Sequence, residues 1–249
     1  MSSCSFSSLS KSLFCIGLSG GLFLLAGVSA QANVVLTTAS GTLGADSYVA
    51  QGSTTTNFGT DFTVKSKNNT DTTDRLLYMR FDISSVSDLV TGGSLTLKAS
   101  TDTGDTVGTL PAESFSLFVL TDQDWDNWVE SGLGGITWSN APARLGSSDT
   151  FDASMAVQIA TGTTTAGASS LTFTLDSSIG TYITADTNDM LTLMIRRNTN
   201  AATTDSFFSK EDTNPLAVAP TLSLTTVPEP SSIPALFLGL AALLVRRRR

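Results

Sequence analysis

Apolar and polar residues alternate along much of the chain between residues 33 and 226. Leu171, Phe173 and Leu175 are separated by single threonines, and residues 75–85 and 191–195 alternate in the same way. A period of two places successive side chains on opposite faces of a β-strand, and polar, glycine-containing turns separate the runs. The pattern predicts many short strands with one buried and one solvated face, which is typical of an all-β sandwich.

One segment follows a helical period instead. Ile179, Tyr182 and Ile183 have the i, i+3, i+4 spacing of a helix face. Asp176 or Ser177, just before them, is suited to accept hydrogen bonds from the first free amides. This spacing predicts one short helix within the β domain.

The start of the chain has the features of an export signal. Lys11 precedes an apolar run over residues 13–28, which ends in small residues around Ala30 and Ala32. A basic start, a short apolar core and small residues before a cleavage point are the layout of a secretory signal peptide. We therefore expect residues 1–32 to be a signal peptide, cleaved after Ala30 or Ala32. A retained membrane anchor is the alternative.

The end of the chain forms a second targeting segment. The motif VPEP at 227–230 is followed by thirteen apolar residues at 233–245 and then by four arginines. Thirteen residues fall short of the ~20 that span a bilayer comfortably, although local thinning makes a span feasible. The arginines would stay on the cytoplasmic side. These residues predict an exported domain that its tail holds transiently in the inner membrane.

The order of Pro-Glu-Pro, short apolar helix and arginine cluster resembles the PEP-CTERM sorting signal. The resemblance implies processing by an exosortase, a membrane transpeptidase-like enzyme. It also implies a place at the cell surface or in the extracellular matrix of a Gram-negative bacterium. An ordinary tail anchor is the alternative. The residues that carry the resemblance are Val227, Pro228, Glu229, Pro230, Arg246, Arg247, Arg248 and Arg249.

Composition excludes several kinds of chemistry. The 249 residues include no histidine, and the only cysteines, Cys4 and Cys15, lie in the predicted signal peptide. Catalysis by histidine or cysteine, zinc or haem ligation and disulfides are therefore excluded for the mature chain. Residues 33–226 carry nine Lys or Arg against 21 Asp or Glu, a net charge of −12 that repels nucleic-acid phosphates. Nucleic acid is not an expected partner.

A series of short motifs within residues 45–226 is similar to a DNRLRE-type module. They are, in order, DSYV at 46–49, NFGTDFTVK at 57–65, RLLYMRFDISS at 75–85, GSLTLK at 93–98, WVESGLGGITWSNAP at 128–142, FFSKED at 207–212 and PTLSL at 220–224. The resemblance implies a jelly-roll β-sandwich of the galactose-binding-like, carbohydrate-binding class over residues 33–226. It also implies association with polysaccharide, in some members with uronic-acid polymers. Within these 249 residues we expect the module to stand alone, without a catalytic partner domain, and its acidity opposes the approach of an anionic polymer.

The tryptophans Trp125, Trp128 and Trp138 lie within fourteen residues of one another. Sugars stack on aromatic rings through their apolar C–H patches, and the polar neighbours of Trp125 and Trp128 favour exposure of at least one ring. These two are candidate carbohydrate-binding residues. The alternative is that they close the end of the sandwich, because Trp is largely buried on average. For Trp138 we expect core packing.

Basic residues form a second candidate surface. Strand alternation directs Lys65 and Lys67 outward and Phe62 and Val64 inward. Arginine can form two parallel hydrogen bonds with one carboxylate. A positive strip on one sheet face would therefore let an acidic domain bind uronates. Edge-strand charges that deter aggregation are the alternative. The candidate carbohydrate-binding strip comprises Lys65, Lys67, Arg75 and Lys98, with Arg80 either as a further member or as a paired structural residue.

Carboxylates supply the candidate metal ligands. The acidic run at 122–130 is not an EF-hand, because Asn127 and Leu133 stand where that loop needs glycine and glutamate. Related jelly rolls often use a calcium ion to pin their first and last strands. By that resemblance Asp46 and Glu211 are candidate ligands of structural Ca²⁺, and solvated turn carboxylates are the alternative.

No residue pair in the sequence is marked as catalytic, so no enzyme is predicted. The sequence predicts a secreted, non-catalytic jelly-roll protein that associates with extracellular polysaccharide through several contacts. One alternative is a structural biofilm or matrix protein without a defined glycan site. The other is a polysaccharide hydrolase or lyase.

Overall fold

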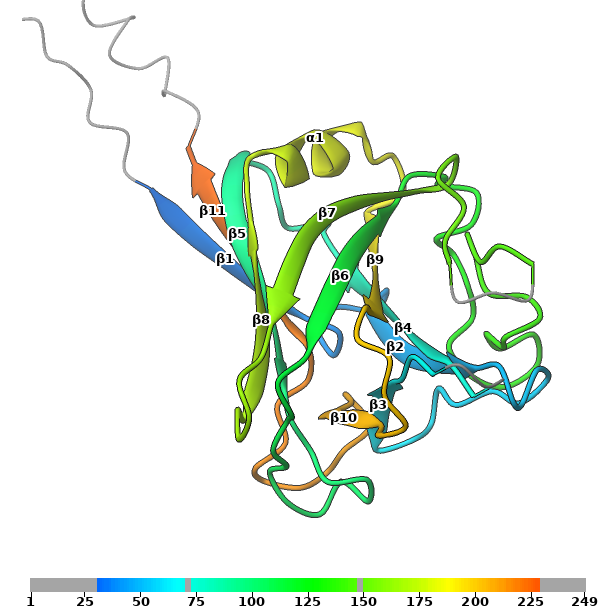
Figure 1. The fold of residues 1–249 in the computed structure, drawn as a ribbon. Helices are drawn as coiled ribbons and strands as arrows, with labels where there is room; N and C mark the ends of the chain where they lie inside the picture. Colours follow the sequence, from blue (N-terminus) through cyan, green and yellow to red (C-terminus); the bar gives the residue numbers. More distant parts are fainter. Residues whose placement is uncertain (1–30, 70–72, 147–149, 229–249) are drawn as a thin grey trace, which may run out of the picture.

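The computed structural model describes residues 31–69, 73–146 and 150–228, which form two antiparallel β-sheets and a separate strand pair (Figure 1). The first sheet contains, in spatial order, β1 (Ala32–Thr37), β11 (Thr221–Val227), β5 (Leu89–Lys98) and β8 (Ser170–Leu175). The second contains β2 (Ala45–Ala50), β4 (Arg75–Asp82), β9 (Met190–Arg197), β6 (Ser114–Leu120) and β7 (Ala156–Thr163). The pair consists of β3 (Thr63–Ser66) and β10 (Asp205–Phe208). The predicted all-β sandwich is confirmed.

The strand order is that of a jelly roll with additions. Without its edge strand β2, the second sheet runs β4-β9-β6-β7, and the first runs β1-β11-β5-β8. Most neighbours in these sheets are not consecutive strands of the chain, as when β11 pairs with both β1 and β5. Eight strands divided in this way between two sheets form the double Greek key of a jelly roll. This order brings the first and last strands of the domain side by side.

The main core fills the space between the two sheets. On β4 the alternate residues Leu77, Met79 and Phe81 belong to it. On β8 every second residue is buried, whereas the residues between them are exposed. Burying a side chain of this size contributes roughly 1.5–3 kcal/mol, so the buried faces hold the sheets together. The predicted alternation of buried and solvated residues is confirmed on β8. On β4 it is only partly correct, because most residues of the other face are buried as well.

A second apolar cluster covers the outer face of the five-stranded sheet. The long connection from β6 to β7 folds over this face, and Trp128 and Trp138 join Tyr78 and Met194 in the cluster. The Tyr78 hydroxyl donates a hydrogen bond to the carbonyl of Pro142, in the same connection, at 3.0 Å. The central strands are therefore buried on both faces. Trp138 packs in this core, as predicted.

Among the described residues there is one helix, α1 (Ser178–Ala185), which lies at one end of the sandwich beside β5 (Figure 1). Ile179 is buried on the predicted helix face. The Asp176 carboxylate accepts a hydrogen bond from the backbone amide of Ser178 at 2.8 Å, whereas Ser177 makes no side-chain cap. The predicted helix is confirmed, and Asp176 is the capping residue.

A buried ion-pair triad holds the C-terminal end of β9. The guanidinium of Arg197 is fully buried and lies 3.1 Å from a carboxylate oxygen of Glu113 and 2.9 Å from one of Asp205. It also donates hydrogen bonds to the backbone carbonyls of Thr199 and Thr203. These contacts join β9 to the start of β10 and to the residue before β6. Removing one partner would leave an uncompensated buried charge.

Both ends of the described chain leave the same edge of the first sheet (Figure 1). There β1 and β11 pair antiparallel, with Ala32 opposite Thr226. The first 30 residues of the predicted signal peptide, and the sorting signal from Glu229 onward, lie outside the described residues. Within the described part of the chain, no helix is both long enough and apolar enough to span a bilayer.

Candidate functional site

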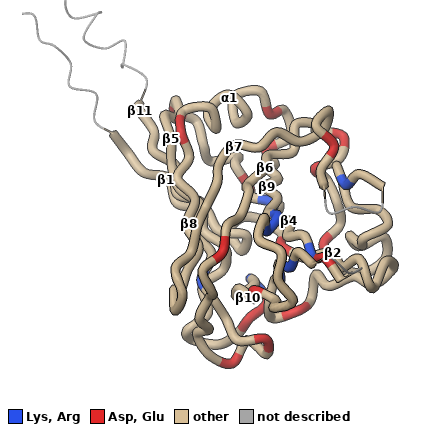
Figure 2. The backbone as a smooth tube through the Cα atoms, viewed as in Figure 1, with Lys and Arg blue, Asp and Glu red and all other residues tan. Residues whose placement is uncertain are grey.

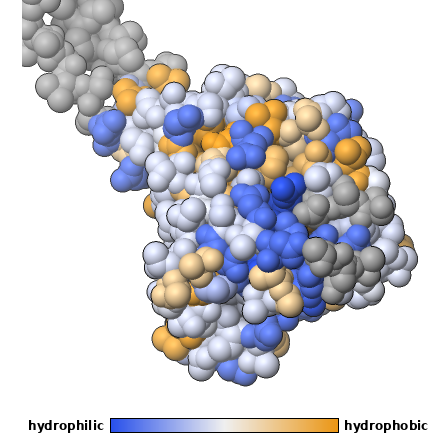
Figure 3. Space-filling model, in the orientation of Figure 1, coloured by the Kyte–Doolittle hydropathy of each residue, from blue (hydrophilic) through white to orange (hydrophobic). Residues whose placement is uncertain are grey.

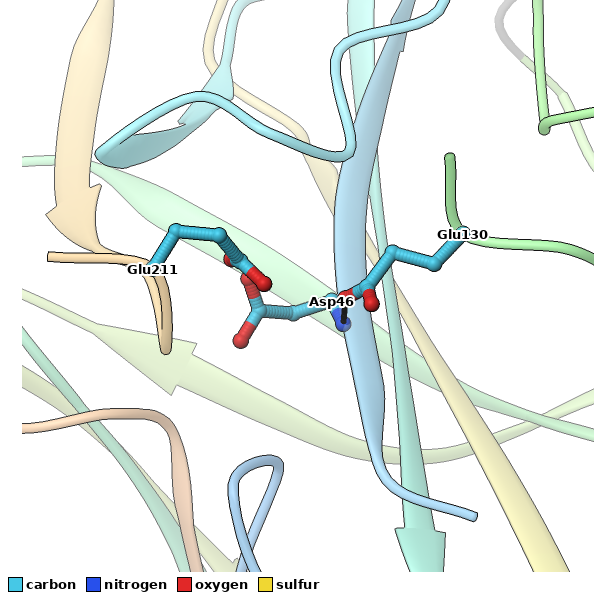
Figure 4. Close-up of side chains that lie close together, drawn as sticks. All are labelled: Asp46, Glu130 and Glu211. Carbon is cyan, nitrogen blue, oxygen red and sulfur yellow. Dashed lines mark hydrogen bonds between the residues drawn. The ribbon is translucent and has the colours of Figure 1, made fainter. Parts of the chain in front are cut away.

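Three carboxylates from distant parts of the chain converge beside β2 (Figure 4). Asp46 lies on β2, Glu211 follows β10, and Glu130 belongs to the β6–β7 connection. One carboxylate oxygen of each residue lies within 4.8 Å of the other two. The backbone amide of Asp46 donates a hydrogen bond to Glu130 Oε1 at 2.6 Å, drawn as a dashed line in Figure 4. The structure thus brings the two predicted metal ligands together and adds a third carboxylate.

This carboxylate cluster contacts one lysine. Lys210 Nζ lies 2.7 Å from an oxygen of Glu130 and 3.7 Å from one of Glu211. Asp46 Oδ2 accepts hydrogen bonds from the Thr38 hydroxyl at 2.5 Å and from the Lys210 amide at 3.1 Å. Asp46 Oδ1 and Glu211 Oε2 are buried and have no hydrogen-bond partner. One lysine therefore faces three carboxylates, two of which have an unpartnered oxygen.

Burial makes ionisation of these carboxyl groups unfavourable. Asp46 is only 1% exposed, and its burial, with repulsion from Glu130 as a further cause, raises the pKa of Asp46 to about 7. Burial also raises the pKa of Glu211 to about 8, and repulsion from Asp46 and Glu130 adds to the effect. A bound cation would oppose both shifts, because it favours the ionised carboxylates.

The cluster fits a hard divalent cation. Ca²⁺ takes six to eight oxygen ligands, and a carboxylate can supply one or both of its oxygens. Three converging carboxylates with two unpartnered buried oxygens are such a donor set. An ion held by Asp46, Glu130 and Glu211 would also connect β2, the β6–β7 connection and the segment after β10.

Sequence reasoning missed Glu130 as a candidate ligand. It lies 84 residues from Asp46, and only the course of the β6–β7 connection brings the two together. The acidic run at 122–130 was the one signal, and nothing in it separates Glu130 from its neighbours.

A second candidate site surrounds Trp125 in the β6–β7 connection. The Trp125 side chain is 51% exposed and lines a hollow of about 250 Å³, termed the Trp125 hollow. The backbone amide of Trp125 donates to the carbonyl of Asp122 at 3.2 Å, which closes a turn. The lining includes Asn127, Asn140 and Pro142, and it contains no charged residue.

The connection that carries the Trp125 hollow is bound to the sandwich on two sides. Arg80, on the outer face of β4, donates to the carbonyls of Asp126 and Trp128 at 3.1 and 2.6 Å. The side-chain amide of Asn57 donates to the carbonyls of Glu130 and Ile136, both at 2.7 Å. Side-chain donors thus satisfy backbone groups of the connection and fix its shape. Arg80 has the structural role that was one of its two predicted roles.

The structure corrects the prediction for Trp128. Its side chain is 7% exposed, its Nε1 donates to the hydroxyl of Thr192 at 3.1 Å, and its ring lies edge-on to Tyr78. The Arg80 guanidinium lies 5.0 Å from the centre of the same ring. Trp128 also lines the Trp125 hollow, but this packing leaves too little of its ring exposed for a sugar to stack on it. Trp125, three residues earlier, faces solvent because the connection turns back onto the sheet between them.

The four cations of the predicted strip lie around β3, β10 and the adjoining ends of β4 and β5, and each has a polar partner. The pairs are Lys65 with Asp102 at 3.9 Å, Lys67 with Thr73 at 2.5 Å, Arg75 with Thr204 at 3.2 Å and Lys98 with the carbonyl of Leu216 at 2.9 Å. Arg80 lies apart from them, under the β6–β7 connection. Each of these cations thus already has an interaction within the protein, which reduces the positive charge that the strip offers to a ligand.

The side chain of Phe62 faces solvent rather than the core, contrary to the prediction. Its side chain is 54% exposed, although alternation with Val64 predicted burial. The reason is that β3 begins only at Thr63, so the alternation of the strand does not extend to Phe62.

The surface as a whole is polar and acidic. Figure 2 shows acidic residues along much of the chain, with basic residues gathered near β4 and β9. On the face shown in Figure 3, hydrophilic residues predominate and apolar residues form separate small patches. Binding by the face shown there therefore depends on local hollows rather than on one extended apolar area.

Two family models match the chain. Residues 37–226 match carbohydrate-binding module family 96, and residues 226–249 match the PEP-CTERM protein-sorting motif. Among curated proteins, none matches this chain. The first match runs from the last residue of β1 almost to the end of β11, so it covers the jelly roll except for most of β1. Both resemblances predicted from the sequence are thus confirmed, and the chain belongs to carbohydrate-binding module family 96.

Proposed function

We propose that this protein associates with extracellular polysaccharide without catalysis, and that the Trp125 hollow is a contact site for sugar rings. The half-exposed ring of Trp125 beside an uncharged hollow is the observation that carries the proposal. Membership of a carbohydrate-binding module family supports the binding of carbohydrate, and the sorting motif supports export.

The chemistry of the Trp125 hollow suits neutral sugars. The indole of Trp125 offers an apolar face to C–H groups, and Asn127 brings an amide to the same hollow for hydroxyl groups. Asn140, which also lines the hollow, bonds to Thr137 and Gly135 and helps to fix its wall. Clefts that combine apolar walls with a few polar groups are typical ligand sites. Because no charged residue lines this one, it offers no partner to a uronate, and the net charge of the domain opposes an anionic polymer.

The carboxylate cluster supports a structural role rather than hydrolysis. A glycosidase needs two carboxyl groups facing each other across a cleft that admits the sugar. Asp46 is almost completely buried, and Lys210 and Glu130 bind it on either side. A sugar cannot reach that carboxylate without disrupting β2.

Asp46, Glu130 and Glu211 are proposed to hold a structural Ca²⁺ ion. The two unpartnered buried oxygens and the excess of negative charge support this assignment. The ion would supply positive charge that Lys210 alone does not, and it would stabilise the junction of three chain segments.

Export and sorting complete the proposal. The chain would first be tethered to the inner membrane by its C-terminal apolar segment, then processed by an exosortase. It would then reach the cell surface or matrix of a Gram-negative bacterium. Val227 ends β11 and Pro228 follows it directly, so the sorting motif begins where the folded domain ends. Many copies on one surface would strengthen a weak individual site by avidity.

Native gel electrophoresis in the presence of polysaccharides tests this function. The full-length chain is run in gels that contain a panel of neutral and uronic-acid polysaccharides. Retardation by a neutral polysaccharide that is lost in Trp125→Ala supports the proposal. Absence of retardation by every polysaccharide would overturn it and favour a purely structural role in the matrix.

A further inference from the structure

Phe62 presents an exposed aromatic ring from a rigid support. Its carbonyl accepts a hydrogen bond from the amide of Ser209 at 3.2 Å, and the next residues, Thr63 and Val64, are buried in the strand pair. The backbone beneath the ring is therefore fixed by β3 and by the residue after β10. Aromatic rings held in this way bind ligands at a low cost in conformational entropy.

Two hollows adjoin the Phe62 ring. Their volumes are about 230 and 250 Å³, and both have Phe62 and Thr103 in their linings, so together they approach the size of a ligand site. They are termed the Phe62 hollows. Their charged lining residues are Asp61, Lys65 and Asp102 in the smaller and Asp105 and Asp212 in the larger.

The wall of these hollows is built into the fold. Gly104 has a φ of +80°, and a Cβ atom there would lie 2.6 Å from Asp212 Oδ2 and 3.1 Å from the Cβ of Phe62. Only glycine permits this approach without strain. The Asn214 side chain donates to the carbonyl of Asp105 at 2.5 Å and holds the loop in place. The hollows are thus fixed features of the loop's conformation.

Negative charge predominates in the Phe62 hollows. Four carboxylates line them against the single lysine Lys65, which already contacts Asp102. Asp212 Oδ2 is buried without a hydrogen-bond partner. Figure 2 shows the acidic residues on the loops around β10, at the end of the domain away from α1. The domain as a whole also has 21 acidic against nine basic residues. A ligand that carries positive charge is therefore favoured here.

We propose that the Phe62 hollows are a second glycan site, selective for sugars that bear primary ammonium groups. The apolar face of an amino sugar would stack on Phe62, and its ammonium groups would reach the exposed carboxylates of Asp102 and Asp105, while Asp212 would add its negative charge from beneath. Charged N–H···O hydrogen bonds are the stronger kind, and an ammonium group is also attracted to the face of an aromatic ring. A uronate would be repelled by the same carboxylates.

This site differs from the Trp125 hollow in residues and in charge. The two linings share no residue, and the Trp125 hollow contains no charged group. The inference rests on the proposed function only in that the protein meets polysaccharide outside the cell. With both sites occupied, one molecule would join a neutral glycan to an amino-sugar polymer.

Calorimetric titration of the full-length chain in mild detergent tests the site. The probes are hexamers of glucosamine, N-acetylglucosamine and glucose at pH 6. The glucosamine hexamer is expected to bind at least about tenfold more tightly than its acetylated form, and less tightly as salt rises. Phe62→Ala should weaken that binding at least about tenfold, as loss of an aromatic anchor does. Asp105→Asn, at an exposed position, should weaken it as well.

Matched variants separate this site from other effects. Val35→Ala removes an equally exposed apolar side chain on β1, Asp88→Asn removes a carboxylate near β5, and both should bind like the wild type. Binding that persists in Phe62→Ala would reveal unspecific attraction to an acidic domain and overturn the proposal. Equal affinity for acetylated and free hexamers would also overturn it. Trp125→Ala should bind the glucosamine hexamer like the wild type. The two proposals can therefore fail separately: the neutral-sugar site is tested by the retardation of Trp125→Ala in polysaccharide gels, and the amino-sugar site by the glucosamine binding of Phe62→Ala.

Discussion

The backbone amide of Lys210 donates a hydrogen bond to the carboxylate of Asp46, 164 residues earlier in the chain, at 3.1 Å. Glu130 and Glu211 lie against the same carboxylate. One buried group of β2 is thus in contact with the β6–β7 connection and with the segment after β10. The charge state of this cluster should therefore affect the stability of the whole sandwich rather than of one loop.

Calcium is expected to raise the melting temperature of the protein. A ligand that binds only the native state stabilises it by about 2.7 kcal/mol at a free concentration 100 times its Kd. Scanning fluorimetry with Ca²⁺ and with a chelator measures the shift. Asp46→Asn should abolish the shift in melting temperature that Ca²⁺ causes, and Asp88→Asn should retain this shift. Superimposable melting curves with and without Ca²⁺ would contradict the proposed calcium site.

Without divalent ions, the protein should lose stability as the pH rises from about 4 to about 8. Burial raises the pKa of Asp46 from 3.8 to about 7 and the pKa of Glu211 from 4.5 to about 8. The native state therefore holds protons in this range that the unfolded chain has released, so the free energy of unfolding falls with rising pH. The loss should be on the order of a few kcal/mol. Urea midpoints at pH 5 and pH 8 in chelator measure it.

Glu211→Gln provides the control for that pH dependence. The amide cannot ionise, so the variant should lose less stability between pH 5 and pH 8 than the wild type. A decline of the same size in both proteins would assign the effect to other groups. Asp126 and Asp205, for which burial raises the pKa to about 6, would then be the next candidates.

Trp125→Ala should weaken retention by a neutral polysaccharide at least about tenfold, because truncation of an aromatic anchor costs ~2 kcal/mol or more. Its free energy of unfolding should change by less than about 0.5 kcal/mol, as is usual for an exposed side chain. Leu133→Ala, at a fully exposed position of the same connection, is the matched control and should be retained like the wild type. A comparable loss of retention in Trp125→Ala and Leu133→Ala would argue against specific stacking of sugars on Trp125.

Arg197→Met should destabilise the domain by about 3–5 kcal/mol, because it leaves Glu113 and Asp205 buried without their cation. Urea unfolding measures the change. Adding Asp205→Asn to this variant should cost less than it does in the wild type, since the two residues share one interaction. Lys65→Ala, which removes a surface pair with Asp102, should cost no more than about 1 kcal/mol. If Arg197→Met and Lys65→Ala lowered the free energy of unfolding by similar amounts, the stabilising role of the buried triad would be contradicted.

Local pattern was sufficient to predict the main elements. The period of two on β4 and β8 predicted strands because successive side chains of a strand point to opposite faces, and this relation holds within a few neighbouring positions. That both faces of β4 are buried depends on the distant β6–β7 connection, which the local pattern does not show. The spacing of Ile179, Tyr182 and Ile183 predicted α1 for the corresponding reason. The absence of histidine and the acidic charge are properties of composition, so no fold could alter them.

The tertiary structure alone decided which of these residues are available for binding. Trp125 and Trp128 have similar polar neighbours in sequence, yet one ring faces solvent and the other is enclosed by Tyr78 and Arg80. Phe62 escapes burial because its strand starts one residue later. Exposure depends on what packs against a side chain, and here the packing partners come from strands and connections far away in the chain. The same distance explains why no local motif could place Glu130 beside Asp46.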